Sequence, residues 1–245
     1  MRRGEDFRWL RVVSSQRTSP TMQRLRLAGE NLQRFSAPDN LHVRLYVPTD
    51  RQLAEQPTNE ITHDDNAYIM RYYTIRNIDA DAGWMEIDFV LHEEVGPGCN
   101  FALTARTGDL CGVSGPCGRG LKPCSSCLLI GDDTAIPAIA RICEALPPDC
   151  VGRILALSQH PATISAPQKM TVNWICPTRV HDLDARRITE EAHTAIDHPL
   201  MRKTFVWAAG EFQLIQDLRS VADRVPKDHS LLVPYWRRTA AVGQE

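Results

Sequence analysis

Arg71, Tyr73 and Thr74 are residues whose types and spacing could do chemistry. They lie in MRYYTIRN, residues 70–77, a stretch rich in strand-forming residues. Because strand side chains alternate between faces, Arg71 and Tyr73 should share one face, with Thr74 on the other. The ring could pack against a flat ligand while the guanidinium pairs with a phosphate. A half-exposed strand would carry the same residues, so the pattern alone leaves both interpretations open.

Three glycine-bearing segments could present backbone N–H groups to a ligand. HEEVGPGCNFA, residues 92–102, places Gly96 and Gly98 around Pro97, and GVSGPCGRG, residues 112–120, is predicted to be a second glycine loop. In IGDDTAIPAI, residues 130–139, a strand end directly precedes a helix N-terminus, where unpaired N–H groups favour anions. No G-x-G-x-x-G fingerprint is present, so an ordinary Rossmann nucleotide site is not predicted.

The cysteines offer a second kind of chemistry. Of eight in the chain, four fall in one short region and include a C-x-x-C: Cys111, Cys117, Cys124 and Cys127. A zinc or iron–sulfur site is one interpretation, although the spacing matches neither a paired C-x-x-C zinc site nor a plant-type cluster. The favoured interpretation is that these cysteines are separate structural thiols. His63, Asp64 and Asp65 could also bind a metal, but a solvated loop explains them more simply.

Composition limits the class of protein. The chain has 245 residues, 43% of them apolar, and a formal net charge of −2, which gives no support for bulk electrostatic binding to nucleic acid. The charged N-terminal stretch lacks the apolar core of a signal peptide, and no run is long and apolar enough to span a bilayer. A cytoplasmic protein without membrane insertion is therefore expected, with thiols rather than disulfides.

The elements that must position these residues change character along the chain. Strand-like runs occupy residues 8–16, 21–29, 41–48 and 70–78. Residues 83–94 alternate, which places Met85, Ile87, Phe89 and Leu91 on one face and Glu86 and Asp88 on the other. Residues 71–92 should form a hairpin, and residues 49–67 a long polar loop.

The second half alternates apolar strands with helical patterns. Strands are predicted at 126–132, 153–159, 170–177 and 203–211, and helices at 133–146, 184–197 and 211–225. Asp133 or Thr134 can cap the first helix, and Pro137 lies early enough to be tolerated. The fold class expected is an N-terminal antiparallel Greek-key β-barrel, residues 1–122, followed by an α/β domain with a parallel sheet, residues 123–245.

Six segments together resemble the siderophore-interacting proteins, FAD-dependent ferric-siderophore reductases related to the ferredoxin-reductase superfamily. They are RYYTIR, IDFVLHEEVGPG, SGPCG, IGDDTAIPAIARICEALP, VWAAGE and PYWRR. The resemblance covers nearly the whole chain. The G-D-[ED]-T-A-[IL]-P-A-I run is its most specific part, whereas R-x-Y-[ST] is shared across the wider flavin superfamily.

The resemblance implies a role for each matching position in the first half. Tyr73 would lie against the flavin, Thr74 would bond the edge of its isoalloxazine ring, and Arg71 would help hold the FAD phosphates. His92 and the run Gly96, Pro97, Gly98 and Cys99 match the second FAD-binding stretch of the family.

In the second half, the resemblance implies that Thr134 and Ala135 lie near the flavin and the donor site. The run Ala209–Glu211 would edge the same cleft. A helix-capping role for Thr134, and an acid favoured by a helix N-terminus for Glu211, are the structural alternatives.

Some positions depart from the family pattern. Glu93 stands where a glycine often follows the histidine, and Asp133 replaces the commoner glutamate. The loop has Gly98, Cys99 and Phe101 in place of an alanine-serine pair and a tryptophan, and Thr239 replaces a glycine. These departures bear on donor choice and substrate fit more than on FAD binding.

The function expected is FAD-dependent reduction of a ferric siderophore with NAD(P)H or reduced ferredoxin as the electron donor. No side-chain nucleophile or general base is required. Arg44, Arg119, Arg237 and Arg238 are the candidates for attracting an anionic siderophore, with plain surface arginines as the alternative. A general NAD(P)H-dependent flavin or ferric reductase, and a siderophore- or metal-binding carrier without redox activity, are the other two functions considered.

Overall fold

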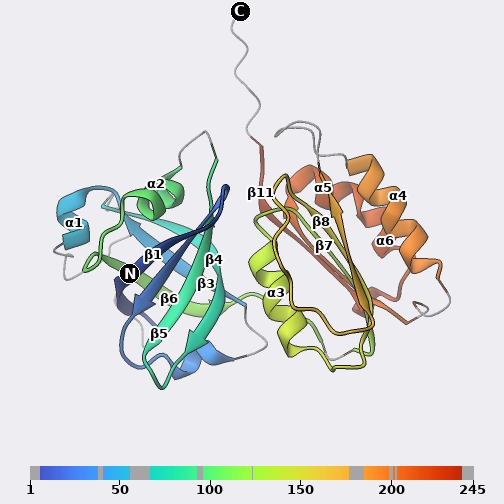
Figure 1. The fold of residues 1–245 in the computed structure, drawn as a ribbon, viewed down its shortest axis with the longest axis horizontal. Coiled ribbons are helices and arrows are strands. Elements are labelled where there is room, and N and C mark those ends of the chain that lie inside the picture. The colour runs from blue at the N-terminus through green and yellow to red at the C-terminus, as the bar shows by residue number, and fades with distance from the viewer. Residues whose placement is uncertain are drawn as a thin grey trace, which may run out of the picture. The chain divides into compact units, whose positions relative to one another are not determined.

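The computed structural model describes residues 6–37, 41–55, 67–92, 96–122, 124–176, 185–198, 201 and 203–238. The chain forms two compact units, Met1–Gly120 and Leu121–Glu245. The first is a β-barrel, and the second is a parallel sheet with helices on both faces (Figure 1). His63, Asp64, Asp65, Glu93 and Thr239 lie outside the described residues.

Six antiparallel strands close the barrel of the first unit in the order β1-β2-β5-β4-β3-β6. The strands are β1 (Arg8–Ser19), β2 (Met22–Ala28), β3 (His42–Pro48), β4 (Tyr68–Asp79), β5 (Trp84–Val90) and β6 (Leu110–Cys117). Because β6 returns to pair with β3 after the β3-β4-β5 meander, the connectivity is a Greek key. The predicted barrel and the predicted hairpin are confirmed.

Alternation along β5 builds the core of the barrel. Met85, Ile87 and Phe89 are fully buried in the interior, as predicted. Glu86, on the other face, is also buried, because Arg26 donates two hydrogen bonds to it and Asn77 donates a third. Burial acts to raise the pKa of Glu86, but the bonds from Asn77 and Arg26 outweigh it and lower the pKa.

Three segments of the first unit were predicted as loops, and each contains an element. A short helix, α1 (Arg51–Glu55), follows Asp50, whose carboxylate accepts from the Leu53 N–H at 2.9 Å. A second helix, α2 (Pro97–Thr104), starts directly after Gly96. Strand β6 takes in most of GVSGPCGRG, because pairing with β1 and β3 on its two sides closes the barrel. A 3-10 helix, η1 (Gln33–Ser36), precedes β3.

The second unit is a five-stranded parallel sheet in the order β11-β10-β7-β8-β9. The strands are β7 (Ser126–Gly131), β8 (Val151–Leu157), β9 (Met170–Ile175), β10 (Phe205–Glu211) and β11 (Ser230–Trp236). The parallel sheet is confirmed. Strand β11 was not predicted, because Pro234 interrupts its apolar run; a proline fits at a sheet edge, and β11 is the edge strand.

Helices cover both faces of this sheet (Figure 1). They are α3 (Ile136–Ala145), α4 (Ala185–Ile196), α5 (Phe212–Asp217), α6 (Arg219–Ala222) and the 3-10 helix η3 (Lys227–His229). The helix α3 lies on one face, and α4, α5 and α6 lie on the other. The helical pattern predicted at 211–225 is confirmed, but it forms two short helices, since α5 ends at Asp217 and α6 begins at Arg219.

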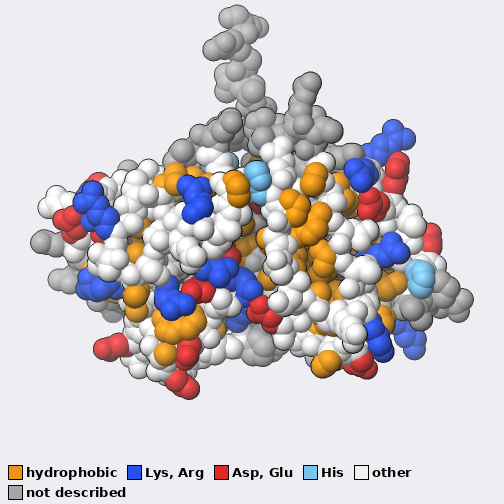
Figure 2. Space-filling model, in the orientation of Figure 1, with side chains coloured by type: hydrophobic (Ala, Val, Ile, Leu, Met, Phe, Trp, Pro, Cys, Tyr) orange, Lys and Arg blue, Asp and Glu red, His pale blue; other side chains and the backbone are white. Residues whose placement is uncertain are grey.

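Among the described residues, no helix is long and apolar enough to cross a membrane. Basic and acidic side chains are interspersed on the visible face (Figure 2), as expected for a chain with a formal net charge of −2.

Candidate functional site

Tyr73 on β4 packs against the first turn of α2. A Cβ atom at Gly98 would lie 1.9 Å from the Tyr73 hydroxyl oxygen, so a glycine is required there for the ring to occupy its place. The ring also contacts Phe89, with centroids 4.4 Å apart. Burial raises the pKa of the Tyr73 hydroxyl. The structure therefore brings together the segment that carries R-x-Y-[ST] and the run Gly96–Cys99.

The N-terminus of α2 is open to an anion. Gly96 is its N-cap residue and makes no side-chain capping bond, while Pro97 lacks an N–H to satisfy. The remaining N–H groups of the first turn have no partner within the helix, and the helix dipole adds positive potential. The His92 ring lies beside this turn, since its Cε1 atom is 3.9 Å from the position of a Cβ at Gly96.

Arg71 and Thr74 flank Tyr73 with opposite exposure. Arg71 is exposed, and its guanidinium donates only to the adjacent Met70 carbonyl among the bonds seen, at 2.8 Å. Thr74 is buried and pairs with His42 on β3. An exposed guanidinium and a ring on β4 thus lie two residues apart, and the uncapped N-terminus of α2 packs on that ring.

Arg44 lies on the outer face of the barrel beside Tyr72. The two residues are directly opposite each other on β3 and β4, and the Arg44 guanidinium lies 5.9 Å from the centre of the Tyr72 ring. Hydrogen bonding to Tyr72 raises the pKa of Arg44. Tyr72 itself is 60% exposed, so the pair presents a cation and a flat ring to solvent. Arg119, just beyond β6, is exposed.

The second unit has its polar centre between β7 and β10. Strand order reverses there, since β7 connects onward to β8 on one side and β10 connects to β11 on the other. In parallel α/β sheets, ligands bind beyond the carboxyl ends of the strands at such a point. Asp132 follows the end of β7, and Glu211 ends β10.

Asp132 ties these strand ends together. Its Oδ1 accepts from the Thr134 N–H at 2.9 Å and from the Thr134 hydroxyl at 2.5 Å. Its Oδ2 accepts from the Glu211 N–H at 2.8 Å and from the Trp236 indole N–H at 2.9 Å. Burial raises the pKa of this carboxyl, against these bonds. A Cβ at Gly210 would lie 2.7 Å from Oδ2, and Gly210 has a φ of +146°, so both space and backbone favour glycine there.

The predicted capping of α3 is wrong. Its N-cap residue is Ala135, which makes no side-chain bond, because the Thr134 side chain turns back to Asp132. Pro137 lies in the first turn, as predicted. The structural alternative for Glu211 is confirmed, since its carboxylate caps α5 by accepting from the N–H groups of Gln213 and Leu214.

Glu211 also holds the segment that follows β11. Its Oε1 accepts from the Arg238 N–H at 3.2 Å. The guanidinium of Arg237 lies 3.8 Å from the centre of the Phe212 ring. Both arginines are exposed, so Glu211 fixes the backbone from which two cations project.

Asp133 is partly buried beside the end of β8. Burial raises the pKa of its carboxyl to about 6, and the nearby charge of Asp132 adds to this. A hydrogen bond with Ser158 and the proximity of His160 act in the opposite direction. The Ser158 hydroxyl also accepts from the His160 N–H at 3.0 Å.

Sequence reasoning missed the parts that Asp132, Ser158 and Trp236 play. Asp132 and Trp236 lie in two of the segments that carried the resemblance, G-D-D-T-A and P-Y-W, but neither residue was assigned a structural or functional role from the sequence. A buried acid next to the turn of a strand-to-helix unit was the available signal. Ser158 gave no signal, because its part depends on β8 lying beside β7.

Comparison with known proteins identifies both units. A siderophore-interacting FAD-binding domain matches residues 11–120, and a siderophore-interacting protein domain matches residues 124–239. The ferric vibriobactin reductase ViuB of Vibrio cholerae is 28% identical over 246 residues, which cover 94% of this chain and 89% of that protein.

Solved structures agree with these matches. The siderophore-interacting protein SipS from Aeromonas hydrophila superimposes with a TM-score of 0.80 at 29% identity, covering 96% of this chain and 93% of that one. A ferredoxin reductase in carbazole 1,9a-dioxygenase shares the fold, with a TM-score of 0.66 at 14% identity over 94% of this chain and 69% of that one. With both of its units matched by the two domains of one family, the chain belongs to the siderophore-interacting protein family.

Proposed function

We propose that this protein is an FAD-dependent oxidoreductase that reduces the iron of ferric siderophores and so releases it as Fe(II). The observation that carries the proposal is the contact of Tyr73 with Gly98 at the uncapped N-terminus of α2, inside the unit matched by the FAD-binding domain. The similarity to a ferric vibriobactin reductase supports the choice of substrate.

The residues of the barrel fit the chemical parts of FAD. The N–H groups of the first turn of α2 and the exposed Arg71 guanidinium would bind the pyrophosphate, as helix N-termini and arginines commonly do. The ring of Tyr73 would contact the isoalloxazine, and His92 would contact the cofactor beside Gly96.

Thr74, Pro97 and Cys99 complete the proposed FAD site. Thr74 would donate to the edge of the isoalloxazine. Pro97 fixes the start of α2, and the buried Cys99 packs under its first turn, so both keep the N–H groups in place.

When bound, FAD would supply a carrier that takes up two electrons and passes them on one at a time, which suits the reduction of Fe(III). The protein would orient the ring and hold the phosphates, and none of its side chains needs to act as a nucleophile or a general base. Fe(II) is a softer ion than Fe(III) and is held less tightly by siderophore oxygens, so reduction favours release.

The donor is proposed to be NAD(P)H or a reduced ferredoxin, with Thr134 and Ala135 assigned to the donor side. The strand ends at Asp132 and Glu211 lie at the reversal of strand order, where α/β sheets bind ligands. Without a G-x-G-x-x-G turn, nicotinamide binding is expected to be weak and without a strong preference set by one acidic contact to ribose.

The substrate is proposed to be drawn in by local positive charge. Arg44 and Arg119 project from the first unit, and Arg237 and Arg238 from the second. An anionic siderophore complex could accept charge-assisted hydrogen bonds from them. Tyr72, 60% exposed beside Arg44, offers a flat surface to catechol-like rings.

The test is anaerobic reduction of the bound flavin with NADH, NADPH or reduced ferredoxin, followed by re-oxidation with several ferric siderophores. Flavin bleaching by one donor, and recovery of colour with stoichiometric Fe(II), is the expected result. Purified protein that stays colourless after incubation with FAD would refute the proposal. Fast, saturable reduction by micromolar NADH but not NADPH would contradict the expected weak donor preference.

A further inference from the structure

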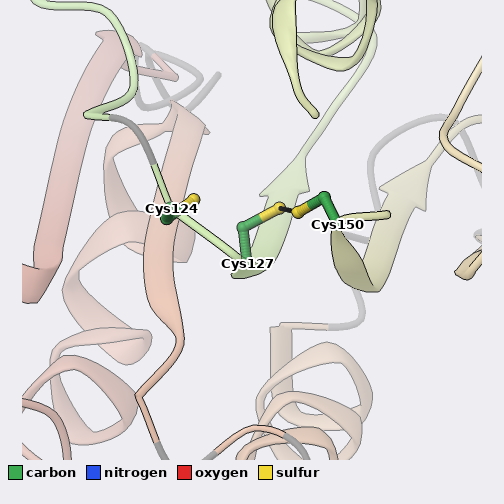
Figure 3. A group of neighbouring side chains, drawn as sticks. All are labelled: Cys124, Cys127 and Cys150. Atoms are coloured by element: carbon green, nitrogen blue, oxygen red, sulfur yellow. Dashed lines mark hydrogen bonds between the residues drawn. The ribbon is translucent and has the colours of Figure 1, made fainter. Parts of the chain in front are cut away.

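Three cysteines of the second unit form a group that the proposed reductase activity does not use. The sequence suggested grouping Cys111, Cys117, Cys124 and Cys127. Cys111 instead lies in the barrel core, and the end of β6 carries Cys117. The partner that joins Cys124 and Cys127 is Cys150, distant in the sequence (Figure 3).

The sulfur atoms of Cys124, Cys127 and Cys150 lie within 4.8 Å of one another. The Cys127 and Cys150 sulfurs are 3.9 Å apart. Among the residues that the structure describes, this is the one group of three or more histidine, cysteine or acidic side chains with such spacing. The group is thus a convergence of three soft donor atoms.

The sheet fixes two of the three positions. Cys127 is the second residue of β7, Cys150 directly precedes β8, and both are fully buried. A Cβ at Gly152 would lie 2.0 Å from the Cys127 carbonyl oxygen, so the two strands approach closely at this point. Cys124 lies on the segment before β7 and is only partly buried, so it can move toward the other two.

We propose that Cys124, Cys127 and Cys150 form a three-thiolate site for a thiophilic metal ion of the class of Zn²⁺ and Cu⁺. Thiolates select such ions over hard cations. With Zn–S bonds of about 2.3 Å, tetrahedral geometry puts neighbouring sulfurs about 3.8 Å apart. The pair at 3.9 Å already has this spacing, and the third sulfur must move by about 1 Å or less.

The site is separate from the strand ends of the second unit that are assigned to the donor side. Cys127 lies at the amino end of β7, whereas Asp132 follows its carboxyl end, so the cysteine group and Asp132 lie at opposite ends of this strand. Partial exposure of Cys124 gives an ion a route of entry and leaves a fourth coordination position for water. Binding of Zn²⁺ by three thiols releases three protons and leaves a complex of charge −1.

A disulfide between Cys127 and Cys150 is the competing interpretation of the same short distance. It would leave Cys124 without a role and would block metal binding. Full reduction of the protein before the measurement removes this obstacle, so a reduced protein that binds no Zn²⁺ counts against the metal site itself.

The experiment titrates Zn²⁺ into the full-length, reduced and chelator-treated protein with its flavin, in competition with a zinc-binding dye. One Zn²⁺ per chain is expected. Cys124→Ser should lower the affinity by more than the about 10- to 100-fold that loss of a supporting contact costs. Cys176→Ser is the matched control, since Cys176 is exposed and outside the group, and it should bind as the wild type does.

A second readout needs no variant. Bound Zn²⁺ should protect Cys124 from alkylation, as mapped by peptide mass spectrometry, but should not protect the exposed Cys176. The proposal is overturned if the reduced protein binds no Zn²⁺, if Cys124→Ser binds as tightly as the wild type, or if Cys176→Ser is the variant that loses the ion. Flavin content, which should be equal in all variants, checks that each is folded.

Discussion

Replacement of Gly98 by alanine should disrupt the contact on which the proposed FAD site depends. The added Cβ would lie 1.9 Å from the Tyr73 hydroxyl oxygen and 3.0 Å from its Cζ. Ordinary contact begins near 3.4 Å, so the separation must grow by about 1.5 Å. Retreat of the ring is restricted, because its centroid lies 4.4 Å from that of Phe89 and it packs against the barrel core.

The expected cost of Gly98→Ala is about 1 to 3 kcal/mol, the usual range for an extra methyl group in a packed site. For a chain of this size, that lowers the melting temperature of the flavin-free protein by about 2 to 12 °C. Displacement of the ring or of the first turn of α2 should also raise the dissociation constant for FAD, measured by quenching of flavin fluorescence.

Gly96→Ala is the matched control, two residues away. Its Cβ would be 3.9 Å from His92 Cε1, an ordinary contact, so no steric cost is expected, and replacement of a glycine N-cap by alanine costs about 0.5 to 1 kcal/mol. Adding Tyr73→Phe to Gly98→Ala removes the closest atom and should recover part of the loss. Equal melting temperatures and equal FAD affinities for Gly96→Ala and Gly98→Ala would refute the steric argument.

Three further predictions test other parts of the structure. Asp132→Ala should lower the free energy of unfolding, measured with urea, by at least about 3 kcal/mol, because four donors lose their acceptor. Trp236→Phe removes only one of these donors and should lower the free energy of unfolding by less. Asp133 has its pKa raised by burial to about 6, so its contribution to stability is present below about pH 4 and is lost as the pH rises to about 6. Asp133→Asn should therefore reduce this loss of unfolding free energy between about pH 4 and pH 6, by up to about 3 kcal/mol. Identical pH profiles of stability for the wild type and Asp133→Asn would contradict the prediction. Arg44→Ala should slow turnover of an anionic ferric siderophore more than turnover of a neutral one, and should leave the flavin content unchanged. The wild-type rate with the anionic substrate should fall as the salt concentration rises. Equal losses of rate on both substrates would make Arg44 a plain surface residue.

The sequence by itself determined the two-part architecture. Period-two alternation at Met85, Ile87 and Phe89 identified a strand with one buried face, and apolar runs alternating with helical patterns identified a parallel sheet. These signals are local, because burial of one face imposes its period on consecutive residues. The motifs at Tyr73 and at G-D-D-T-A were likewise readable, since each is a short run of adjacent residues.

Only the tertiary structure decided which of these residues meet. The need for glycine at position 98 depends on the Tyr73 side chain reaching it from another element, and the bond from Trp236 to Asp132 spans 104 positions. Cys150 joined Cys124 and Cys127 because β7 and β8 are parallel neighbours, whereas Cys111 and Cys117, closer in sequence, belong to the barrel. Distance along the chain says little about contact between strands, because strand order and register are set by the packing of the whole sheet.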